Sequence, residues 1–285
     1  MIFFKYHGVG NDFVLIDNLN QSVAEEDKSP LSIRLCDRRF GIGGDGLLLV
    51  ESSSNADAMM RIFNPDGSEA SMCGNGIRCF AKYLYDHGIA KKEMLKIETK
   101  SGVKEAFLTV ENGVVTYVKV DMGKPLFESG DIPARGSGRL INHKIEVDGR
   151  DVVVTGVNTG VPHLVIFSDD VEGEDVKKIG RALRYNEMFP KGTNVNFVEK
   201  RGENQFKIRT YEKGVEDETL ACGTGITASG AVAVYLNMAR SDSAIEFQAR
   251  GGTVYIEIEK KEEEISKALM NGPTEFVFEG KTQLF

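Results

Sequence analysis

The sequence predicts an α+β protein that contains a good deal of strand and is divided into two similar domains. Short segments that alternate apolar and polar residues, or that gather β-branched and aromatic residues, recur along the chain. Turn residues separate them, as at Asn112-Gly113, Asp148-Gly149 and Gly251-Gly252. Fewer segments show helical spacing, and a sequence repeat places one cysteine in each half of the 285 residues.

The predicted elements follow from these patterns in chain order. Helices are predicted over residues 31–39 and 171–183, and two more begin directly after Cys73 and Cys222. In the first of these, Ile77 and Leu84 lie at helical spacing and His87-Gly88 is a typical stop. The predicted strands include residues 13–16, 58–63, 114–120, 152–157, 163–167, 206–211 and 254–258.

The repeat surrounds the two cysteines. Residues 69–77 read Glu-Ala-Ser-Met-Cys-Gly-Asn-Gly-Ile, and residues 218–226 read Glu-Thr-Leu-Ala-Cys-Gly-Thr-Gly-Ile. The match extends back to Arg61-Ile-Phe63 and Arg209-Thr-Tyr211, which end the strand before each loop. Two such copies predict two similar domains that face each other, joined through the segment rich in Gly and Pro over residues 123–138.

The composition excludes several classes of function. The net charge is −8 and there is no basic block, so nucleic-acid binding is not expected. No apolar run approaches the ~20 residues that cross a bilayer, and the first residues do not resemble a signal peptide. The four cysteines lack the spacing of a metal site. We therefore expect a reduced cytoplasmic protein without a metal.

Both repeated cysteines directly precede a glycine-rich helix start. The N–H groups and the positive end of the helix dipole there favour an anion and lower the pKa of a thiol. Inverting a stereocentre needs a base on one face and an acid on the other, and a thiolate with a thiol meets that need. The same dipoles stabilise charge that develops on a substrate carboxylate. The sequence therefore predicts a cofactor-independent amino-acid racemase or epimerase that uses Cys73 and Cys222.

Other motifs do not carry this chemistry. Cys36 and Cys79 lie in apolar helical patterns and are interpreted as packing residues. The loop Gly41-Ile-Gly-Gly-Asp-Gly46 matches neither a dinucleotide fingerprint nor a P-loop.

The residues around the first cysteine resemble a known family. Asn64-Pro-Asp-Gly-Ser68, followed by Cys73-Gly-Asn-Gly-Ile-Arg78, is similar to the signature of the diaminopimelate epimerase family. Further similar segments span most of the chain and read His7-Gly-Val-Gly-Asn-Asp-Phe13, Asn158-Thr-Gly-Val-Pro-His163, Arg209-Thr-Tyr-Glu212 and the segment from Glu218 to Gly225.

The resemblance implies an architecture and a reaction. Each domain would be a β-rich shell around a central helix, with the substrate in the cleft between them. The last strand, near Asn271, would return to the first domain, which gives domains over 1–122 plus 270–285 and over 123–269. The implied reaction interconverts LL- and meso-2,6-diaminoheptanedioate for lysine or cell-wall precursors. A homodimer without a cofactor is also implied.

The resemblance assigns roles to individual residues. Cys73 and Cys222 would be the acid–base pair, with His163 and Glu212 as accessory groups that help to set the protonation of the thiols. The implied substrate contacts are Asn11, Asn64, Gly74, Asn75, Asn194, Lys213, Gly223 and Thr224.

The chain departs from the family pattern at three positions. Lys213 stands where many members have Arg, Val161 where some have Asn, and Gly46 where some have Gln. Lysine can pair with a distal carboxylate but cannot form the bidentate fork of arginine. These changes concern the far end of the substrate rather than the thiols.

Two alternatives stay open from the sequence. One is another cofactor-independent racemase of the same fold, for example a proline-type enzyme. The other is a redox or binding protein in which Cys73 and Cys222 form a disulfide.

Overall fold

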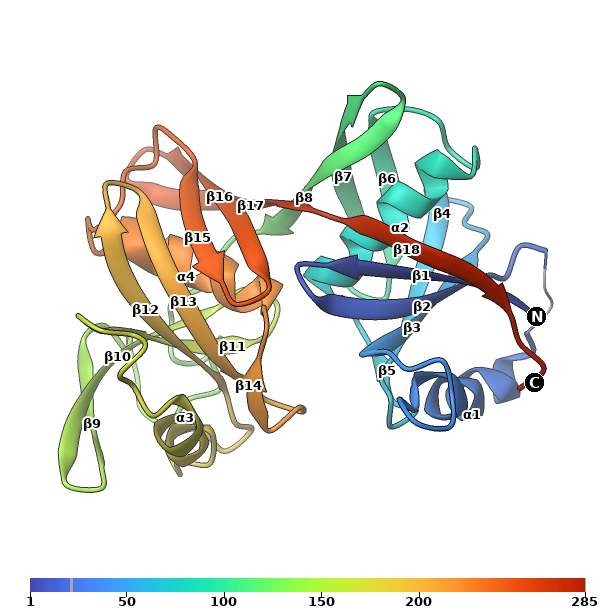
Figure 1. Ribbon diagram of the computed structural model, residues 1–285. Coiled ribbons are helices and arrows are strands. Elements are labelled where there is room, and N and C mark those ends of the chain that lie inside the picture. Colours follow the sequence, from blue (N-terminus) through green and yellow to red (C-terminus); the bar gives the residue numbers. More distant parts are fainter. Residues whose placement is uncertain (21–22, 285) are drawn as a thin grey trace. The chain divides into compact units, whose positions relative to one another are not determined.

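The computed structural model (Figure 1) describes residues 1–20 and 23–284, which form two compact units. Unit 1 contains Met1–Asp121 together with the C-terminal segment that starts at Gly272, and unit 2 contains Met122–Asn271. The sequence analysis places the divisions after residues 122 and 269. The chain passes from one unit to the other within β8 (Val114–Gly123) and returns within β17 (Glu264–Pro273).

The strands of unit 1 pair in the order β18, β1, β2, β3, β4, β6, β7, β8, and β5 pairs with the end of β4. The pairs β2–β3 and β4–β6 are parallel, and the others are antiparallel. Besides β8, the strands are β1 (Ile2–Gly8), β2 (Asn11–Asp17), β3 (Gly46–Glu51), β4 (Ala58–Phe63), β5 (Glu69–Ala70), β6 (Met94–Thr99), β7 (Gly102–Glu111) and β18 (Glu275–Lys281).

Unit 2 repeats this order and these directions. Its strands pair as β9, β10, β11, β12, β13, β15, β16, β17, with β14 beside the end of β13, and β11–β12 and β13–β15 are the parallel pairs. Besides β17, they are β9 (His143–Val147), β10 (Arg150–Asn158), β11 (Pro162–Phe167), β12 (Asn194–Gly202), β13 (Gln205–Glu212), β14 (Asp217–Thr219), β15 (Ile245–Ala249) and β16 (Gly252–Lys261). The duplication therefore extends from the cysteine loops to the whole topology.

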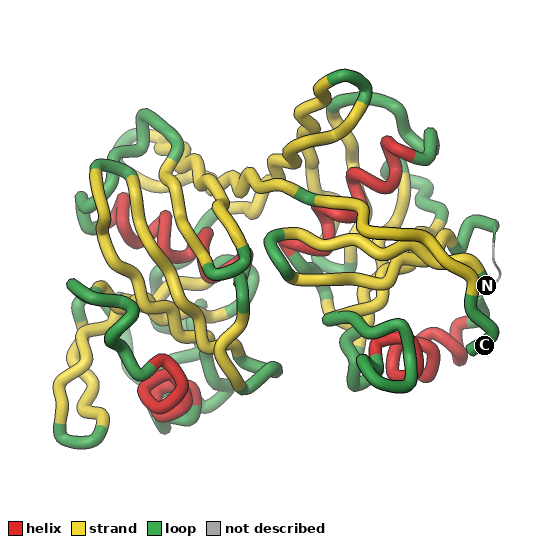
Figure 2. Tube along the Cα trace, in the orientation of Figure 1, coloured by secondary structure: helices red, strands yellow, loops and turns green. Residues whose placement is uncertain are grey.

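One helix is enclosed by the strands of each unit (Figure 2). In unit 1, α2 (Gly74–Asp86) packs against β1, β2, β3, β4, β6 and β7, and each of its residues from Gly74 to Leu84 is buried. In unit 2, α4 (Gly223–Tyr235) packs against β10, β11, β12 and β16 and is buried nearly all round. A helix that is apolar on all faces is stable only in such a setting. The predicted shell around a central helix is thus confirmed for each unit.

Two further helices lie on the outside of the strands, and their predicted bounds were wrong. The observed α1 (Glu25–Cys36) starts before the predicted residue 31 because the acidic residues of its first turn favour a helix start and Pro30 is tolerated inside it. It ends before residue 39 because the Asp37 side chain accepts hydrogen bonds from the N–H groups of Arg39 and Phe40.

The outer helix of unit 2, α3 (Val176–Arg184), begins later than the predicted residue 171. Asp175 caps it by accepting a hydrogen bond from the N–H of Lys178 at 3.1 Å. Val171 instead lies in the preceding loop, where its N–H donates to the carboxylate of Glu199. The local capping residue therefore overrides the apolar pattern that suggested the earlier start.

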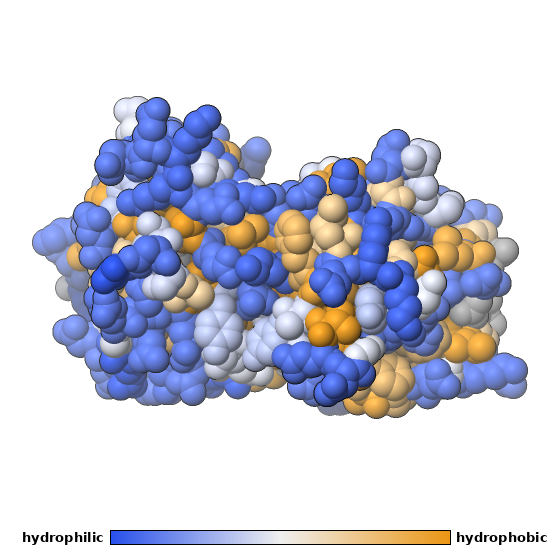
Figure 3. All heavy atoms as spheres, turned by 90° about the horizontal axis from the view of Figure 1, so that it is seen from above, coloured by the Kyte–Doolittle hydropathy of each residue, from blue (hydrophilic) through white to orange (hydrophobic). Residues whose placement is uncertain are grey.

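The surface is mostly polar, with one apolar strand among the exceptions. On the face shown in Figure 3, hydrophilic residues predominate and hydrophobic residues form separate groups. In unit 1, β18 pairs with β1 and exposes 45% of Phe276, 50% of Val277 and 43% of Phe278. Such a strand edge is open to association with another strand.

The close approach of Gly180 in α3 to Tyr211 in β13 allows the packing of α3 to be tested. A Cβ atom there would lie 2.4 Å from Cβ of Tyr211, so α3 would have to move off the strands. We expect Gly180→Ala to lower the free energy of unfolding by about 1–3 kcal/mol, the usual range for overpacking, as measured by urea denaturation. Gly130→Ala, which would meet no atom within 4 Å, is the matched control. Equal stability of the two variants would contradict the packing of α3.

Candidate active site

Each repeated cysteine is the residue that begins a central helix. Cys73 is the N-cap of α2 and Cys222 is the N-cap of α4, and both have extended backbone conformations. The N–H of Gly76 donates to Sγ of Cys73 at 3.4 Å. Each sulfur therefore lies at the positive end of a helix dipole, where negative charge is favoured. Cys36 and Cys79 are buried, as predicted for packing residues.

Two asparagines surround Cys73. Oδ1 of Asn11 lies 3.9 Å from Sγ of Cys73 and accepts a hydrogen bond from Nδ2 of Asn75 at 3.1 Å. Nδ2 of Asn11 donates to a carboxylate oxygen of Asp45 at 2.7 Å. Because a carboxylate can only accept, this contact turns the amide oxygen of Asn11 toward the thiol. The predicted residues Asn11, Gly74 and Asn75 thus gather around Cys73.

The carboxylate that orients Asn11 belongs to a charged network that the sequence analysis missed. Arg38 pairs with Asp45 at 2.7 Å and with Asp12 at 2.6 Å, and Lys5 pairs with Asp12 at 2.6 Å. Burial acts to raise the pKa of Asp12, but hydrogen bonds from Arg38 and Lys5 outweigh it and lower the pKa to about 2. The turn that carries Asn11 is therefore held by groups that stay ionised at neutral pH.

Asn64 follows β4 directly, at the start of a tight turn. Its Nδ2 donates to Oγ of Ser68 at 2.9 Å, and its N–H donates to the carbonyl oxygen of Ser68. Gly67 has φ of +86°, which glycine adopts without strain. This turn connects β4 to β5, which in turn leads to Cys73.

In unit 2, the first turn of α4 is anchored to the loop that follows β10. Oγ1 of Thr224 lies 3.5 Å from Sγ of Cys222, and Oγ1 of Thr159 donates to the carbonyl oxygen of Thr224 at 2.9 Å. Gly223 is the first residue of α4, as Gly74 is of α2. The predicted residues Gly223 and Thr224 therefore lie beside Cys222.

His163 is entirely buried on β11. Its Nδ1 lies 3.2 Å from Nδ2 of Asn196, and among the described residues its Nε2 has no hydrogen-bond partner. Burial lowers the pKa of His163 to about 3, so the imidazole is neutral at physiological pH. A neutral imidazole can donate a hydrogen bond from one ring nitrogen and accept one at the other.

Glu212 ends β13, and Oγ1 of Thr219 donates to its carboxylate at 3.0 Å. The next residue, Lys213, donates from Nζ to the carbonyl oxygen of Lys191 at 2.7 Å. Burial and then the nearby charge of Arg184 lower the pKa of Lys213. Thr219 is a further residue that the sequence analysis missed.

Both the nitrogen and the oxygen of the Asn194 side-chain amide form hydrogen bonds. Its Nδ2 donates to the carbonyl oxygen of Pro162 at 3.1 Å, and its Oδ1 accepts from the N–H of Lys213 at 2.9 Å. Asn194 thereby ties the segment before His163 to the segment after Glu212. Each amide atom retains capacity for one more hydrogen bond.

The strand registers identify which residues of the two units are equivalent. Phe13 pairs with Gly46 as His163 pairs with Asn194, and Leu47 pairs with Phe63 as Val195 pairs with Tyr211. Phe13 is therefore equivalent to His163, and Asn64, which follows Phe63, is equivalent to Glu212, which follows Tyr211. In unit 1, a phenyl ring therefore takes the place of the imidazole of His163, and an amide takes the place of the carboxylate of Glu212.

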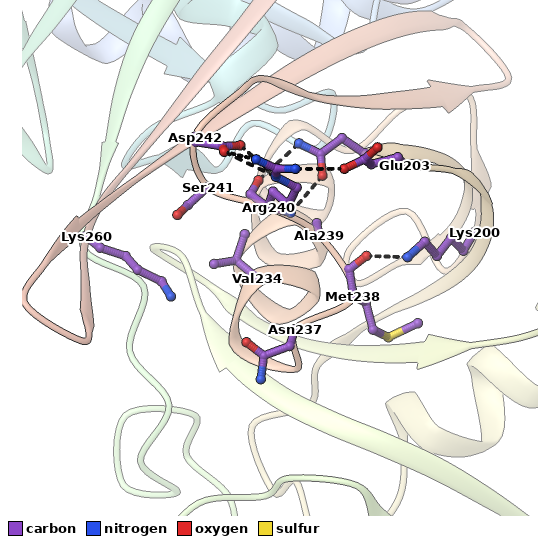
Figure 4. A pocket seen from close by; sticks show the side chains of 11 residues that line it. Lys200, Glu203, Val234, Asn237, Met238, Ala239, Arg240, Ser241, Asp242 and Lys260 are labelled. Carbon is purple, nitrogen blue, oxygen red and sulfur yellow. Dashed lines mark hydrogen bonds and ion pairs between the residues drawn. The ribbon is translucent and has the colours of Figure 1, made fainter.

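Two hollows on the surface of unit 2 are not lined by any of the predicted site residues. One of about 460 Å³ surrounds the C-terminal end of α4 (Figure 4). There Lys200 donates to the carbonyl oxygen of Met238 at 2.7 Å, and Arg240 pairs with Asp242 and Glu203. Cations at this end neutralise the negative pole of the helix dipole, so we interpret these contacts as structural. A second hollow of about 490 Å³, next to Arg150 and Glu174, contains none of the predicted site residues.

Among the described residues, no cluster of three or more His, Cys, Asp or Glu side chains could hold a metal ion. In the same part of the chain, no helix has the length and apolarity to cross a membrane.

Comparisons with known proteins agree with this geometry. A profile of the family described as diaminopimelate epimerase matches residues 3–128 and 155–277. The diaminopimelate epimerase of Methanocella arvoryzae is 48% identical over 280 residues, covering 98% of this chain and 95% of that protein. The diaminopimelate epimerase of Caldanaerobacter subterraneus subsp. tengcongensis is 43% identical over 285 residues, covering both chains completely.

A solved structure shares the fold. The Bacillus anthracis phenazine biosynthesis protein of the PhzF family superimposes with a TM-score of 0.75 at 19% identity, covering 99% of this chain and 98% of that one.

The buried histidine makes the stability of the protein depend on pH. The pKa of His163 is about 3 in the folded state and about 6.5 when unfolded, so the unfolded state binds the proton more tightly. Protonation therefore destabilises the fold increasingly as the pH falls below 6.5. Between pH 7.5 and pH 5, wild type should lose about 2 kcal/mol more than His163→Phe in urea unfolding. Equal losses would show that His163 is protonated in the folded state.

Proposed function

Because the chain belongs to the diaminopimelate epimerase family, we propose that it interconverts LL- and meso-2,6-diaminoheptanedioate. The observation that carries this proposal is the placement of Cys73 and Cys222 as N-caps of the two buried, equivalent helices. A substrate carboxylate bound at the helix starts would be stabilised by their N–H groups and dipoles. The two sulfurs would then act on opposite faces of the same α-carbon.

The proposed reaction is a transfer of two protons. A thiolate removes the α-proton and forms an S–H bond, while the electron pair of the broken C–H bond moves onto the α-carbon and its carboxylate. The thiol on the opposite face donates its proton to the α-carbon and becomes the thiolate. The positive ends of the dipoles of α2 and α4 stabilise the negative charge that develops on the carboxylate during this step. The two thiols supply both proton-transfer groups, so the mechanism assigns no step to a cofactor.

Glu212 and His163, both in unit 2, are further titratable groups of the proposed site. We propose that Glu212 and His163 act as accessory groups for the thiol chemistry. His163 can serve as a hydrogen-bond donor or acceptor but not as a cation, because burial keeps it neutral. Their equivalents, Phe13 and Asn64, cannot exchange protons near neutral pH. The proposed accessory groups thus both come from unit 2, whereas each unit supplies one thiol and some of the proposed substrate contacts.

We propose that the asparagines and the helix starts bind the polar groups of the substrate. Asn11 and Asn75 are oriented beside Cys73, and Asn194 has unused hydrogen-bonding capacity. The remaining proposed contacts are Asn64, Gly74, Gly223, Thr224 and Lys213. Lys213, bound to the carbonyl oxygen of Lys191, would pair with the distal carboxylate as a point charge rather than as a fork.

The proposed thiol chemistry requires both cysteines in the reduced state. A thiolate and a thiol are both lost if the cysteines are oxidised, so we propose that the enzyme acts in a reducing cytoplasm. Its product would feed the synthesis of lysine or of cell-wall precursors.

We also propose that the protein is a homodimer formed through β18. This strand pairs with β1 and exposes Phe276, Val277 and Phe278, an arrangement that favours association with a further strand.

Substitution of the thiols tests the proposed reaction. Reduced wild type should convert the LL isomer to the meso isomer, as followed by chiral chromatography. Cys73→Ala and Cys222→Ala should each lower kcat by at least about 10³-fold, since each removes one of two obligatory proton-transfer groups. Cys36→Ala, which alters a buried packing residue, should retain activity. An inactive wild type, or full activity in either active-site variant, would refute the mechanism.

The dimer proposal is tested at β18. Phe278→Lys places a charge on the exposed face of this strand and should convert the protein to a monomer in sedimentation equilibrium. Phe107→Lys, on the exposed side of β7, is the control and should leave the oligomeric state unchanged. A monomeric wild type would contradict the proposal.

A further inference from the structure

Three polar side chains form a buried row across neighbouring strands of unit 2. His163 on β11, Asn196 on β12 and Thr210 on β13 are nearly or wholly inaccessible to solvent. Nδ2 of Asn196 contacts Nδ1 of His163 at 3.2 Å, and Oγ1 of Thr210 donates to Oδ1 of Asn196 at 3.0 Å. A Cβ on Gly225 would lie 2.2 Å from Oδ1 of Asn196, so this row lies directly under the first turn of α4, three residues after Cys222.

The equivalent row in unit 1 is entirely apolar. The registers that match Phe13 to His163 also match Leu48 to Asn196 and Ile62 to Thr210. The packing confirms the match, because a Cβ on Gly76, the equivalent of Gly225, would meet Leu48 at 3.3 Å and Ile62 at 3.5 Å. All three apolar residues are buried.

Comparing the two rows shows whether the fold itself requires polar side chains beneath the central helix. Phe13, Leu48 and Ile62 show that this topology accepts an apolar row beneath the central helix. Burying polar groups is unfavourable unless each is hydrogen-bonded, and even then it is no better than apolar packing of similar shape. The polar row in unit 2 therefore indicates a requirement of the site rather than of the fold.

The hydrogen bonds of Asn196 determine where the proton on His163 lies. One side-chain atom of Asn196 lies 3.0 Å from the carbonyl oxygen of Leu164, which can only accept, so that atom is the amide nitrogen. The second N–H of the same nitrogen is directed to Nδ1 of His163. Nδ1 must then accept, and in a neutral imidazole the proton lies on Nε2. The hydroxyl of Thr210 completes the arrangement by donating to the amide oxygen.

We propose that Asn196 is a positioning residue that holds His163 in the tautomer with its proton on Nε2, so that this nitrogen donates a hydrogen bond during the reaction. Among the described residues, Nε2 has no partner, which leaves its N–H for the substrate or for a thiol. The part of this inference that concerns the reaction rests on the proposed epimerase activity. The part that concerns the tautomer of His163 does not.

The tautomer can be read directly from the protein. The chain has four histidines, so ¹⁵N-histidine labelling and long-range ¹H–¹⁵N correlation spectra give four ring systems, and His163→Phe identifies the one from His163. We expect wild type without substrate to show His163 with Nε2 protonated and Nδ1 unprotonated. A proton on Nδ1 would overturn the proposal.

Two substitutions at Asn196 separate positioning from structural support. Asn196→Asp replaces the donor by an acceptor and should move the proton of His163 to Nδ1. Asn196→Leu introduces the residue found at the equivalent position of unit 1 and should fold. Each variant should lower kcat by about 10- to 100-fold, by analogy with the loss that follows removal of the hydrogen-bond partner of a metal-binding histidine.

Ser229→Ala is the matched control, because Ser229 is equally buried in unit 2 and its hydroxyl donates, within the described part of the chain, to the carbonyl oxygen of Gly225. It should leave both the tautomer and kcat unchanged. Wild-type kcat in folded Asn196→Leu, or an unchanged tautomer in Asn196→Asp, would overturn the proposal. A wild type that lacks epimerase activity would instead refute the proposed reaction, and the spectra recorded without substrate distinguish the two failures.

Discussion

The architecture depends on a cysteine at the start of a helix that is enclosed by strands. The surrounding strands exclude water from most of each central helix. The electrostatic field of the unsatisfied N–H groups is therefore strongest at the helix N-terminus, where Cys73 or Cys222 lies. Glycines at the first and third positions of each helix keep side chains away from that end. The same construction occurs once in each unit.

The two sulfurs occupy equivalent positions in the two units, whereas the side chains around them differ between the units. In unit 1, a network of ionised side chains holds Asn11 so that its oxygen faces Cys73. In unit 2, hydrogen bonds between neighbouring strands hold a neutral histidine. The two units share strand order and register, so these differences are confined to side chains and do not require different folds. A symmetric scaffold thereby provides two chemically different half-sites.

The sequence allowed some of these features to be predicted but not others. The cysteines, the helix starts and the duplication were predictable because the repeated residues are contiguous and their effect is local. The start of α1 was mispredicted because Pro30 resembles a boundary, although packing against β3 and β4 keeps the helix intact. The roles of Asp45 and Asn196 could not be predicted, because their partners come from other loops and strands. The strand registers and the packing beneath the two central helices show that Asn196 takes the place of Leu48.

The central claim, that two different thiols exchange protons with one α-carbon, is tested most directly by the fate of the α-hydrogen. Reduced enzyme would be given the LL isomer in D₂O, and the first few per cent of reaction analysed by mass spectrometry of the separated isomers. The account predicts that the meso product carries one deuterium from the first turnover while the remaining LL isomer carries none, since the acid that completes the inversion holds a solvent-derived hydrogen. Product that retains the original hydrogen, or equal labelling of substrate and product, would show that a single group transfers the proton and would contradict the account.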